Sequence, residues 1–158
     1  MQMSNRISGF QCSPIRRLVP MARAAKERGV HVIHLNIGQP DIKTPKEALD
    51  AIHNYKDETI AYGLSEGEVG LRKALLEYYK KMGVDDLTIN DIMITTGGSE
   101  AIQFTFITLC DPYDEFIIPE PYYTNVATFA NVAMVRLRPV TSSSSNGFIL
   151  PSIDAFEE

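Results

Sequence analysis

The chain has 158 residues, of which 44% are hydrophobic and 22% are charged, and its formal net charge is −5. This composition is typical of a globular protein with a core, and the acidic balance argues against a nucleic-acid surface, which is normally basic. No apolar run is long enough for a membrane span, and the N-terminus lacks a secretory signal. The two cysteines lie far apart and match no metal-ligand spacing. We therefore expect a cytoplasmic protein without a metal site.

Residues 13–29 form the first predicted helix, with Ser13 as its cap and Pro14 at the first helical position. Pro20 lies inside this segment and predicts a kink or a late start, because proline has no N–H and clashes with the preceding turn. Residues 31–37 are a candidate for a short strand, which the following glycine and proline break.

Two predicted helices follow. Thr44 and Glu47 match a capping box with a proline after the threonine, which predicts a helix that runs to about Tyr55. After a polar loop at residues 58–67, leucine and tyrosine side chains recur at helical spacing from Glu68 to Met82 and predict an amphipathic helix.

Short β-branched segments then alternate with apolar helical ones. We expect strands at residues 92–95, 115–119 and 134–140, and helices at residues 100–110 and 123–131. This alternation favours an α/β fold with a mainly parallel sheet and right-handed crossovers. Three strands make a small sheet, and a last helix capped by Ser152 is cut short, so we expect the N-terminal part of a longer protein.

The stretch from Asp91 to Gln103 reads as a strand, a glycine pair and the start of a helix. Such a corner points free backbone N–H groups and the positive end of a helix dipole at one spot, which can hold a phosphate or another anion. Gly97 and Gly98 allow close backbone approach, and Ser99 can cap the helix and offer its hydroxyl. A tight turn without a ligand fits the same residues, and both interpretations stay open at this point.

Other polar residues indicate no further chemistry. His31 and His34 point to opposite faces of the predicted strand and cannot share a metal ion. Cys12 and Cys110 are expected to be free thiols, and Cys110, at the end of an apolar helix, is expected to be a small core hydrophobe. We find no Ser/His/Asp or Cys/His arrangement typical of a nucleophilic enzyme.

Five segments in a fixed order carry a family resemblance. They are Asn36-Ile-Gly-Gln-Pro-Asp41, Tyr62-Gly-Leu-Ser-Glu-Gly67, Leu71-Arg-Lys-Ala74, the glycine corner, and Pro119-Glu-Pro-Tyr-Tyr-Thr-Asn125. Together they resemble the N-terminal third of the class I and II aminotransferases, which are pyridoxal-phosphate enzymes of fold type I. The resemblance runs from about Ser13 to the end of the chain.

The resemblance implies a fold and a domain organisation. The chain would be the N-terminal portion of the large domain of fold type I, an α/β domain with a mainly parallel sheet and flanking helices, preceded by an N-terminal helical arm. Residues 1–45 would form that arm and a small-domain segment. Residues 46–158 would form the first, truncated part of the cofactor-binding large domain.

The resemblance also implies a cofactor site for pyridoxal 5′-phosphate. Gly98, Ser99 and Glu100 match the loop whose backbone amides hold the cofactor phosphate, and the carboxylate of Glu100 should point away, since a charge beside phosphate would repel it. Tyr123 matches the aromatic residue that stacks on the pyridine ring. If the family resemblance is set aside, the sequence also fits a simpler interpretation, in which Tyr122 and Tyr123 are aromatic residues of the core or the surface after a turn.

Two more residues have family counterparts. Tyr62 matches a tyrosine that reaches the cofactor phosphate of the neighbouring subunit in family dimers; packing on the next helix is the alternative. Gly38 lies in the segment that lines the carboxylate end of the substrate, where glycine permits close approach. Ordinary turn chemistry also explains Gly38 and its neighbours.

The implied activity is transfer of an amino group between an amino acid and a 2-oxo acid, by a homodimer that contacts neither nucleic acid nor membrane. In the family the lysine that forms the Schiff base stands in a Ser-x-x-Lys context, and no such sequence occurs here. We therefore expect the chain alone to be inactive. Two alternatives remain open: another fold type I enzyme, such as a C–S lyase or an enzyme like ACC synthase, or a non-catalytic phosphate-binding or interaction module.

Overall fold

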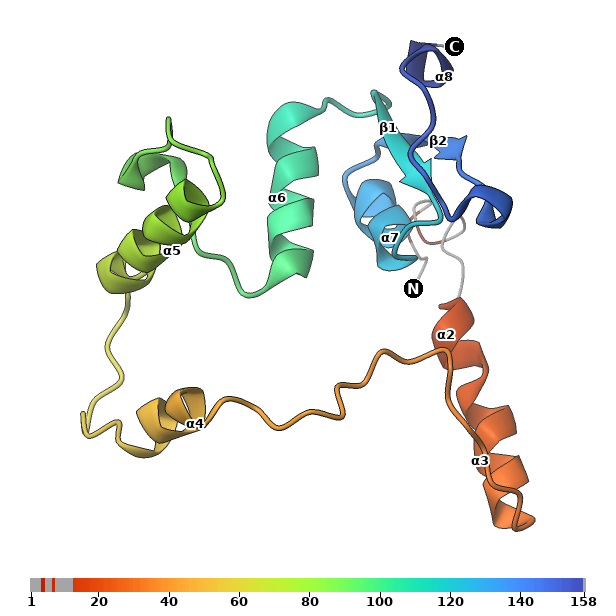
Figure 1. Ribbon diagram of the computed structural model, residues 1–158, viewed down its shortest axis with the longest axis horizontal. Coiled ribbons are helices and arrows are strands. Elements are labelled where there is room, and N and C mark those ends of the chain that lie inside the picture. Colours follow the sequence, from red (N-terminus) through yellow and green to blue (C-terminus); the bar gives the residue numbers. More distant parts are fainter. Residues whose placement is uncertain (1–3, 5–6, 8–12, 158) are drawn as a thin grey trace. The chain divides into compact units, whose positions relative to one another are not determined.

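The computed structural model describes residues 4, 7 and 13–157, so the expectation for Cys12 lies outside the described residues. The chain divides into two compact units (Figure 1). The first unit comprises Met1–Ala24 and Thr95–Glu158, and the second comprises Ala25–Ile94. The expected domain boundary between residues 45 and 46 stays a prediction.

The N-terminal helix begins and breaks as predicted. In α2 (Pro14–Arg17) the backbone N–H of Arg16 donates to Ser13 Oγ at 3.4 Å, and proline takes the first helical position. The chain then starts a new helix, α3 (Val19–Glu27). Pro20 falls in the first turn of α3, where its missing N–H would have no intrahelical acceptor, and the predicted interruption is confirmed.

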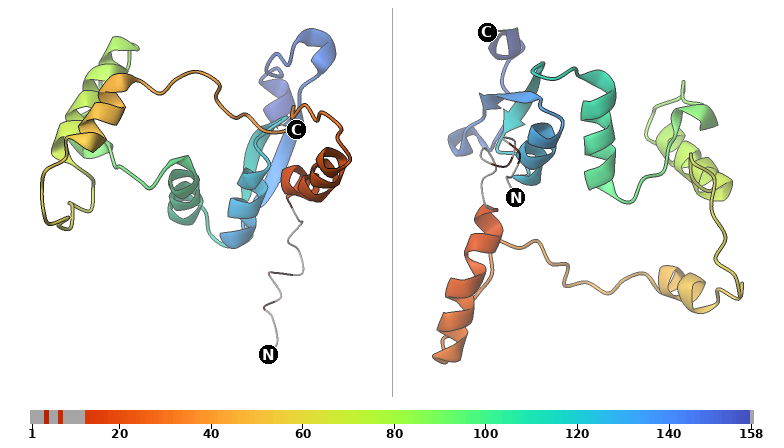
Figure 2. Two further views of the ribbon diagram at one scale, coloured as in Figure 1. Left: turned by 90° about the horizontal axis from the view of Figure 1, so that it is seen from below. Right: turned by 180° about the vertical axis from the view of Figure 1, so that it is seen from behind.

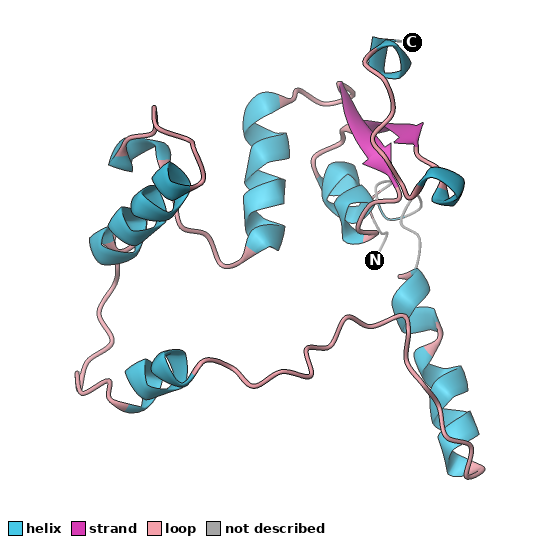
Figure 3. Cartoon of the chain, viewed as in Figure 1, coloured by secondary structure: helices cyan, strands magenta, loops and turns pink. Residues whose placement is uncertain are grey.

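The centre of the first unit is a β–α–β unit with one further helix. Its elements are α6 (Gly98–Leu109), β1 (Glu115–Glu120), α7 (Asn125–Val132) and β2 (Arg136–Thr141). The two strands pair in parallel from Glu115 opposite Arg136 to Glu120 opposite Thr141 (Figure 3). Both helices and two of the three predicted strands are thereby confirmed, as is the parallel arrangement.

A small apolar core holds this unit together. Its buried side chains are Phe106, Val126, Ala130 and Val135. Phe106 is only 2% exposed, and its ring meets that of Phe116 on β1 edge to face, with centroids 5.0 Å apart. Cys110 packs against the same cluster, which confirms the prediction that it is a core hydrophobe. Figure 2 shows α7 against the strands from two further directions.

The second unit contains two of the predicted helices and a short turn. They are α4 (Lys46–His53), α5 (Val69–Lys81) and the 3-10 helix η1 (Ile89–Asp91). The N-cap of α4 is Pro45 and no side chain caps it, so the predicted capping box with Thr44 is wrong. The carboxylate of Asp50 instead pairs with Lys46 one turn earlier on the surface of α4.

Two predicted strands are wrong. Residues 31–37 form no ladder among the described residues, and Ile33 and Leu35 are 73% and 93% exposed. Residues 92–95 are also not a strand; the backbone at Ile92 is extended, but the segment makes a single long-range backbone bond, from Ile94 N–H to the Glu66 carbonyl at 2.9 Å. A strand is stable only when a neighbour completes its ladder, which local β propensity cannot supply.

The C-terminal segment leaves β2 through a polar turn. It contains the 3-10 helix η2 (Ser144–Asn146) and the short helix α8 (Asp154–Glu157), which begins two residues after the predicted cap Ser152. None of the helices in the described ranges has the length and hydropathy needed to cross a membrane.

Candidate functional site

The glycine corner before α6 has a backbone that only glycine adopts easily. Gly97 is the N-cap of α6 with φ 86° and ψ 172°, a region almost closed to residues with a Cβ. Its N–H donates to the Thr95 carbonyl at 2.7 Å and tightens the turn. Apart from the adjacent residues and the backbone of α6 itself, no atom of the described residues lies within 4 Å of the place where a Cβ would stand on Gly97 or Gly98. The surface of the corner is therefore bare backbone.

Three backbone N–H groups at this corner have no acceptor in the part of the chain that the structure describes. The first N–H groups of a helix have no intrahelical acceptor, and the first bond of this kind in α6 runs from Ala101 to the Gly97 carbonyl at 3.3 Å. Within the described part of the chain, no acceptor takes the N–H groups of Gly98, Ser99 or Glu100. With the helix dipole behind them, these groups can hold an anion.

The side chains of the corner differ in part from expectation. The predicted cap at Ser99 is wrong: Gly97 is the N-cap, and Ser99 lies exposed in the first turn. Glycine fits better because the chain enters the helix with positive φ. Glu100 Oε2 accepts the N–H of Thr96 at 2.6 Å. The carboxylate is thus bound to the residue before the N-cap and leaves the N–H groups of the first turn available.

The loop between β1 and α7 separates two neighbouring tyrosines. Tyr122 packs against the apolar core, whereas Tyr123 is 57% exposed. Tyr123 Oη accepts a hydrogen bond from Asn125 Nδ2 at 2.7 Å, and its carbonyl accepts the N–H of Val126 at 2.9 Å. The structure therefore presents one tyrosine of the pair and fixes its hydroxyl. The hydrogen bond from Asn125 was not predicted from the sequence, although an amide side chain two positions after a tyrosine can indicate such a bond.

The corner and this loop lie at the same end of the first unit. Figure 1 shows that α6 starts, and β1 ends, at this end. In an open α/β sheet the helices run opposite to the strands, so helix N-termini and strand carboxyl ends meet at one edge, where ligands usually bind. The topology thus brings Gly98, Ser99 and Glu100 to the same edge as Tyr123.

A recess beside the same loop was not predicted. It has a volume of about 500 Å³ and is lined by the start of α2, by the loop after β1 and by α7. Thr124 contributes to the lining, and its buried hydroxyl has no hydrogen-bond partner among the described residues. The sequence offers no signal for this recess, because Ser13 and Thr124 meet only in the fold.

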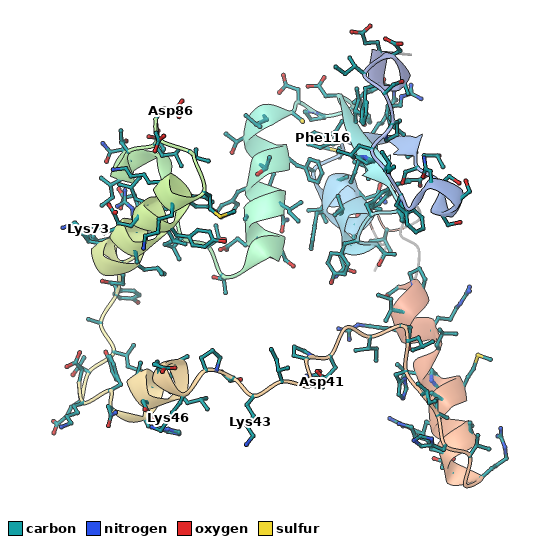
Figure 4. All side chains as sticks on the ribbon, in the orientation of Figure 1. Asp41, Lys43, Lys46, Lys73, Asp86 and Phe116 are labelled. Carbon is teal, nitrogen blue, oxygen red and sulfur yellow. The ribbon has the colours of Figure 1, made fainter. Side chains whose placement is uncertain are left out.

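The remaining predicted site residues, Tyr62 and Gly38, belong to the second unit. Tyr62 is 106% exposed in the loop between α4 and α5, so its ring does not pack on α5. Gly38 is exposed, and apart from its two neighbours in the chain no described residue has an atom within 4 Å of the place where a Cβ would stand on it. It precedes an extended segment from which the side chains of Asp41 and Lys43 project (Figure 4). The structure shows both Tyr62 and Gly38 as accessible.

Among the described residues, two carboxyl groups have shifted pKa values, and both make contacts that hold the fold. Hydrogen bonds from the hydroxyl and the backbone N–H of Thr88 lower the pKa of Asp91. The hydrogen bond from the guanidinium of Arg138 lowers the pKa of Glu115 and holds β1 to β2. Both ionised carboxylates are acceptors in these contacts.

Comparison with known proteins identifies the family. The sequence model described as aminotransferase class I and II matches residues 30–155. The chain belongs to this family. The predicted resemblance is therefore confirmed over most of the chain.

Individual aminotransferases agree with this assignment. The aspartate aminotransferase of Pyrococcus horikoshii is 32% identical over 148 residues, which cover 93% of this chain and 37% of the relative. The LL-diaminopimelate aminotransferase of Moorella thermoacetica is 31% identical, over 98% of this chain and 40% of the relative. The crystal structure of the Thermotoga maritima aspartate aminotransferase matches with a TM-score of 0.87 and 26% identity, over 98% of this chain and 41% of that one.

These comparisons confirm the predicted fold class. The chain has the α/β fold of the fold type I enzymes, with a parallel pair of strands and flanking helices. It spans about two fifths of the length of these relatives.

Proposed function

We propose that this chain is the N-terminal part of a pyridoxal-phosphate-dependent aminotransferase that moves an amino group between an amino acid and a 2-oxo acid. The observation that carries the proposal is the open glycine corner at the start of α6, in a chain of this family. Pyridoxal phosphate, when bound, supplies the electron sink that aminotransfer needs. The relatives that match are named as aminotransferases, for aspartate and for LL-diaminopimelate among others.

The residues of the corner fit a phosphate. The free N–H groups of Gly98, Ser99 and Glu100 would donate to its oxygens. The carboxylate of Glu100 accepts the N–H of Thr96, so a phosphate does not have to displace it from these donors. Bare glycine backbone lets a phosphate approach closely, because no Cβ stands in the way.

Tyr123 would cover the flat face of the cofactor ring. Its side chain is exposed, and the hydrogen bond from Asn125 limits the rotation of the phenol. A held aromatic ring orients a bound pyridine ring better than a freely moving one, since less conformational freedom is lost on stacking. Asn125 is therefore assigned a supporting role in the site.

Tyr62 and Gly38 complete the proposal. Tyr62 would donate its hydroxyl to the cofactor phosphate of a neighbouring subunit in a homodimer, and its full exposure supports a role outside its own unit. Gly38 would line the carboxylate end of the substrate, and its open surroundings support close approach.

The chain alone is proposed to be inactive. Transamination needs an amine that binds the cofactor and moves a proton, and none of the seven lysines stands in a Ser-x-x-Lys context. All of them precede the glycine corner in the sequence. The remaining part of the parent enzyme would supply this lysine.

Binding of pyridoxal phosphate and of inorganic phosphate to the 158-residue chain tests the site. We expect both to bind and to compete, as followed by phosphorus NMR. Gly98→Pro removes one N–H at the first helical position, where proline is tolerated, and should weaken binding of inorganic phosphate. Gly98→Ala is the matched control, because it keeps the N–H. Equal phosphate affinity for the wild type and Gly98→Pro would contradict the proposal.

A turnover assay tests the inactivity of the chain. With pyridoxal phosphate, aspartate and 2-oxoglutarate, we expect no product above the rate of free cofactor. Cofactor-dependent product formation that disappears after borohydride treatment would show that a lysine of this chain has taken over the amine's role.

A further inference from the structure

The turn after β2 contains an asparagine directly before a glycine, and no other asparagine of the chain precedes a glycine. Asn146 is the last residue of η2, and Gly147 follows it with φ 73° and ψ 25°. Both residues are exposed. Within the described residues, the side-chain hydrogen bonds of this turn join Ser143 to Ser145 and leave out the carboxamide of Asn146. This carboxamide can therefore turn toward the backbone of the next residue.

Gly147 exposes its backbone nitrogen to that carboxamide. A residue with a Cβ shields its own nitrogen from the side chain before it, whereas glycine has no such group. Apart from the two chain neighbours of Gly147, no described atom lies within 4 Å of the place where its Cβ would stand. The nitrogen of one residue and the side-chain carbonyl carbon of an asparagine before it can close a five-membered ring. Asn146 and Gly147 have the order in which this closure meets the least steric hindrance.

The turn η2 restrains the nitrogen that would attack. The N–H of Gly147 donates to the carbonyl of Ser144 at 3.3 Å. Ser143 Oγ caps the turn by accepting the N–H of Ser145 at 3.2 Å. While these bonds hold, the N–H of Gly147 is occupied, so the ring closes only after the turn has opened locally.

The backbone after Gly147 favours this opening. Phe148 has a φ of 59°, which is unusual for a bulky residue and costs backbone strain. Its N–H is bound to the carbonyl of Ser143 at 2.8 Å, and this bond closes the turn around Gly147. Phe148 is 53% exposed, so little packing holds it in place. Opening η2 releases the strain and therefore costs less than the opening of an unstrained turn.

We propose that Asn146–Gly147 is a deamidation site of this chain and that the turn η2 sets its rate. The backbone nitrogen of Gly147 loses its proton and forms a bond to Cγ of Asn146. The bond between Cγ and Nδ2 breaks, and the amide group leaves as ammonia with that proton. Water then opens the cyclic imide at either carbonyl and gives aspartate or isoaspartate. Nothing is oxidised or reduced, and water is the co-reactant.

The reaction changes the charge and the backbone of the turn. A carboxylate replaces a neutral amide, so the formal net charge of −5 becomes more negative by one. The isoaspartate product also adds a methylene group to the main chain. The modified residue follows the carboxyl end of β2, and ligands of open α/β sheets usually bind at this edge. Deamidation therefore places a new negative charge near that edge.

Incubation of the 158-residue chain at mildly alkaline pH, followed by peptide mass spectrometry, tests the site. We expect residue 146 to gain the mass difference between an amide and a carboxyl group, with separate aspartate and isoaspartate peptides. Asn54 is the internal control, because it is also exposed but precedes Tyr55. Absence of conversion at Asn146, or equal conversion at Asn54, overturns the proposal.

Gly147→Ala tests the part that the missing Cβ plays. Alanine is strained at this positive φ, and strain alone would open η2 and speed the reaction. We expect the opposite, with no converted Asn146 detected in the time that converts half of the wild type. Conversion of Gly147→Ala as fast as that of the wild type overturns the proposal.

Two neighbouring serines test the control by η2. Ser143→Ala removes the cap, and we expect about fivefold faster deamidation, the factor that matches the loss of a typical cap. Ser144→Ala is the matched control, because Ser144 is exposed in η2 and its hydroxyl has no hydrogen bond among the residues that the structure describes. Equal deamidation rates in the two variants overturn the control by η2.

Discussion

The two units of this chain are held together by different kinds of interaction. Within the described ranges, the first unit buries four apolar side chains, Phe106 and three others, whereas the buried residues of the second unit are Ile92 and Arg72. Apolar burial has no direction and tolerates small shifts. A guanidinium that serves two carbonyls depends on geometry, so a single substitution can release it.

This difference indicates how each unit should respond to a substitution. The second unit also exposes large apolar side chains, including Ile33, Leu35 and Ile60. Exposed apolar surface of this kind is typical of faces that another part of a protein covers. We therefore expect the first unit to resist perturbation through its own core and the second to respond to changes in single polar contacts.

The largest expected effect is the loss of the core of the first unit. Phe106→Ala should lower the free energy of unfolding by about 3–5 kcal/mol, because it removes buried area and leaves a cavity. Urea titration with hydrogen exchange as the readout would show the loss in α6 and α7. Phe104→Ala is the control, since Phe104 is exposed on the same helix. Equal losses for both variants would show that Phe106 is not the centre of the core.

The next effect concerns the backbone of the glycine corner. Gly97→Ala should cost about 1–3 kcal/mol, because its φ and ψ lie in a region that residues with a Cβ rarely adopt. Gly98→Ala should be neutral or slightly stabilising, since Gly98 is helical and its surroundings are open. Urea unfolding of the two variants compares the cost of backbone strain at Gly97 with the cost of adding a Cβ in open space at Gly98. If both alanines cost the same, the strain is not at Gly97.

A smaller effect is expected in the second unit. Thr88→Ala removes the hydroxyl that accepts the N–H of Asn90 at 3.3 Å and donates to Asp91 Oδ2 at 2.7 Å. Loss of such a cap costs about 1 kcal/mol. Hydrogen exchange of η1 and of Ile94 measures it. Thr88→Ser keeps the hydroxyl and should retain the stability; a loss as large as that of alanine would point to the methyl group instead.

The smallest effect is a dependence on pH. The hydrogen bond from the Thr88 hydroxyl lowers the pKa of Asp91 below its usual 3.8. A lowered carboxyl pKa stabilises the folded state above the unfolded pKa, and this stabilisation is lost as the pH falls through the folded value. Acidification below about pH 4 should therefore lower the protection of the η1 amides relative to their intrinsic exchange rates at the same pH. Asp91→Asn should lack this acid response; an identical response would assign it to another group.

Much of the fold could be predicted because it depends on residues close together in the sequence. Helix caps such as Ser13, the break at Pro20 and the apolar spacing of α5 to α7 are local signals. The strands at residues 31–37 and 92–95 were wrong because the same local signal needs a neighbouring strand. The caps at Thr44 and Ser99 were wrong because the backbone direction at the helix start decides which residue caps it.

The candidate site divides in the same way. The glycine corner follows from a short motif that contains Gly97 and Gly98, whereas the exposure of Tyr123 and the burial of Tyr122 became visible only in the structure. The bond from Thr96 to Glu100 spans a turn that the sequence pattern does not define. The contacts of Arg72 reach residues 17 and 20 positions away, so no local pattern indicates them.

By itself, the sequence determined that this chain has alternating helices and strands, a glycine corner with free amides, and the ordered motifs of an aminotransferase, because each of these depends on spacing along the chain. Only the tertiary structure decided which extended segments became strands, which tyrosine of the pair stayed exposed, and that a buried arginine binds the carbonyls of Ile89 and Ile92. Those outcomes depend on contacts between distant residues, which form only after the chain has folded.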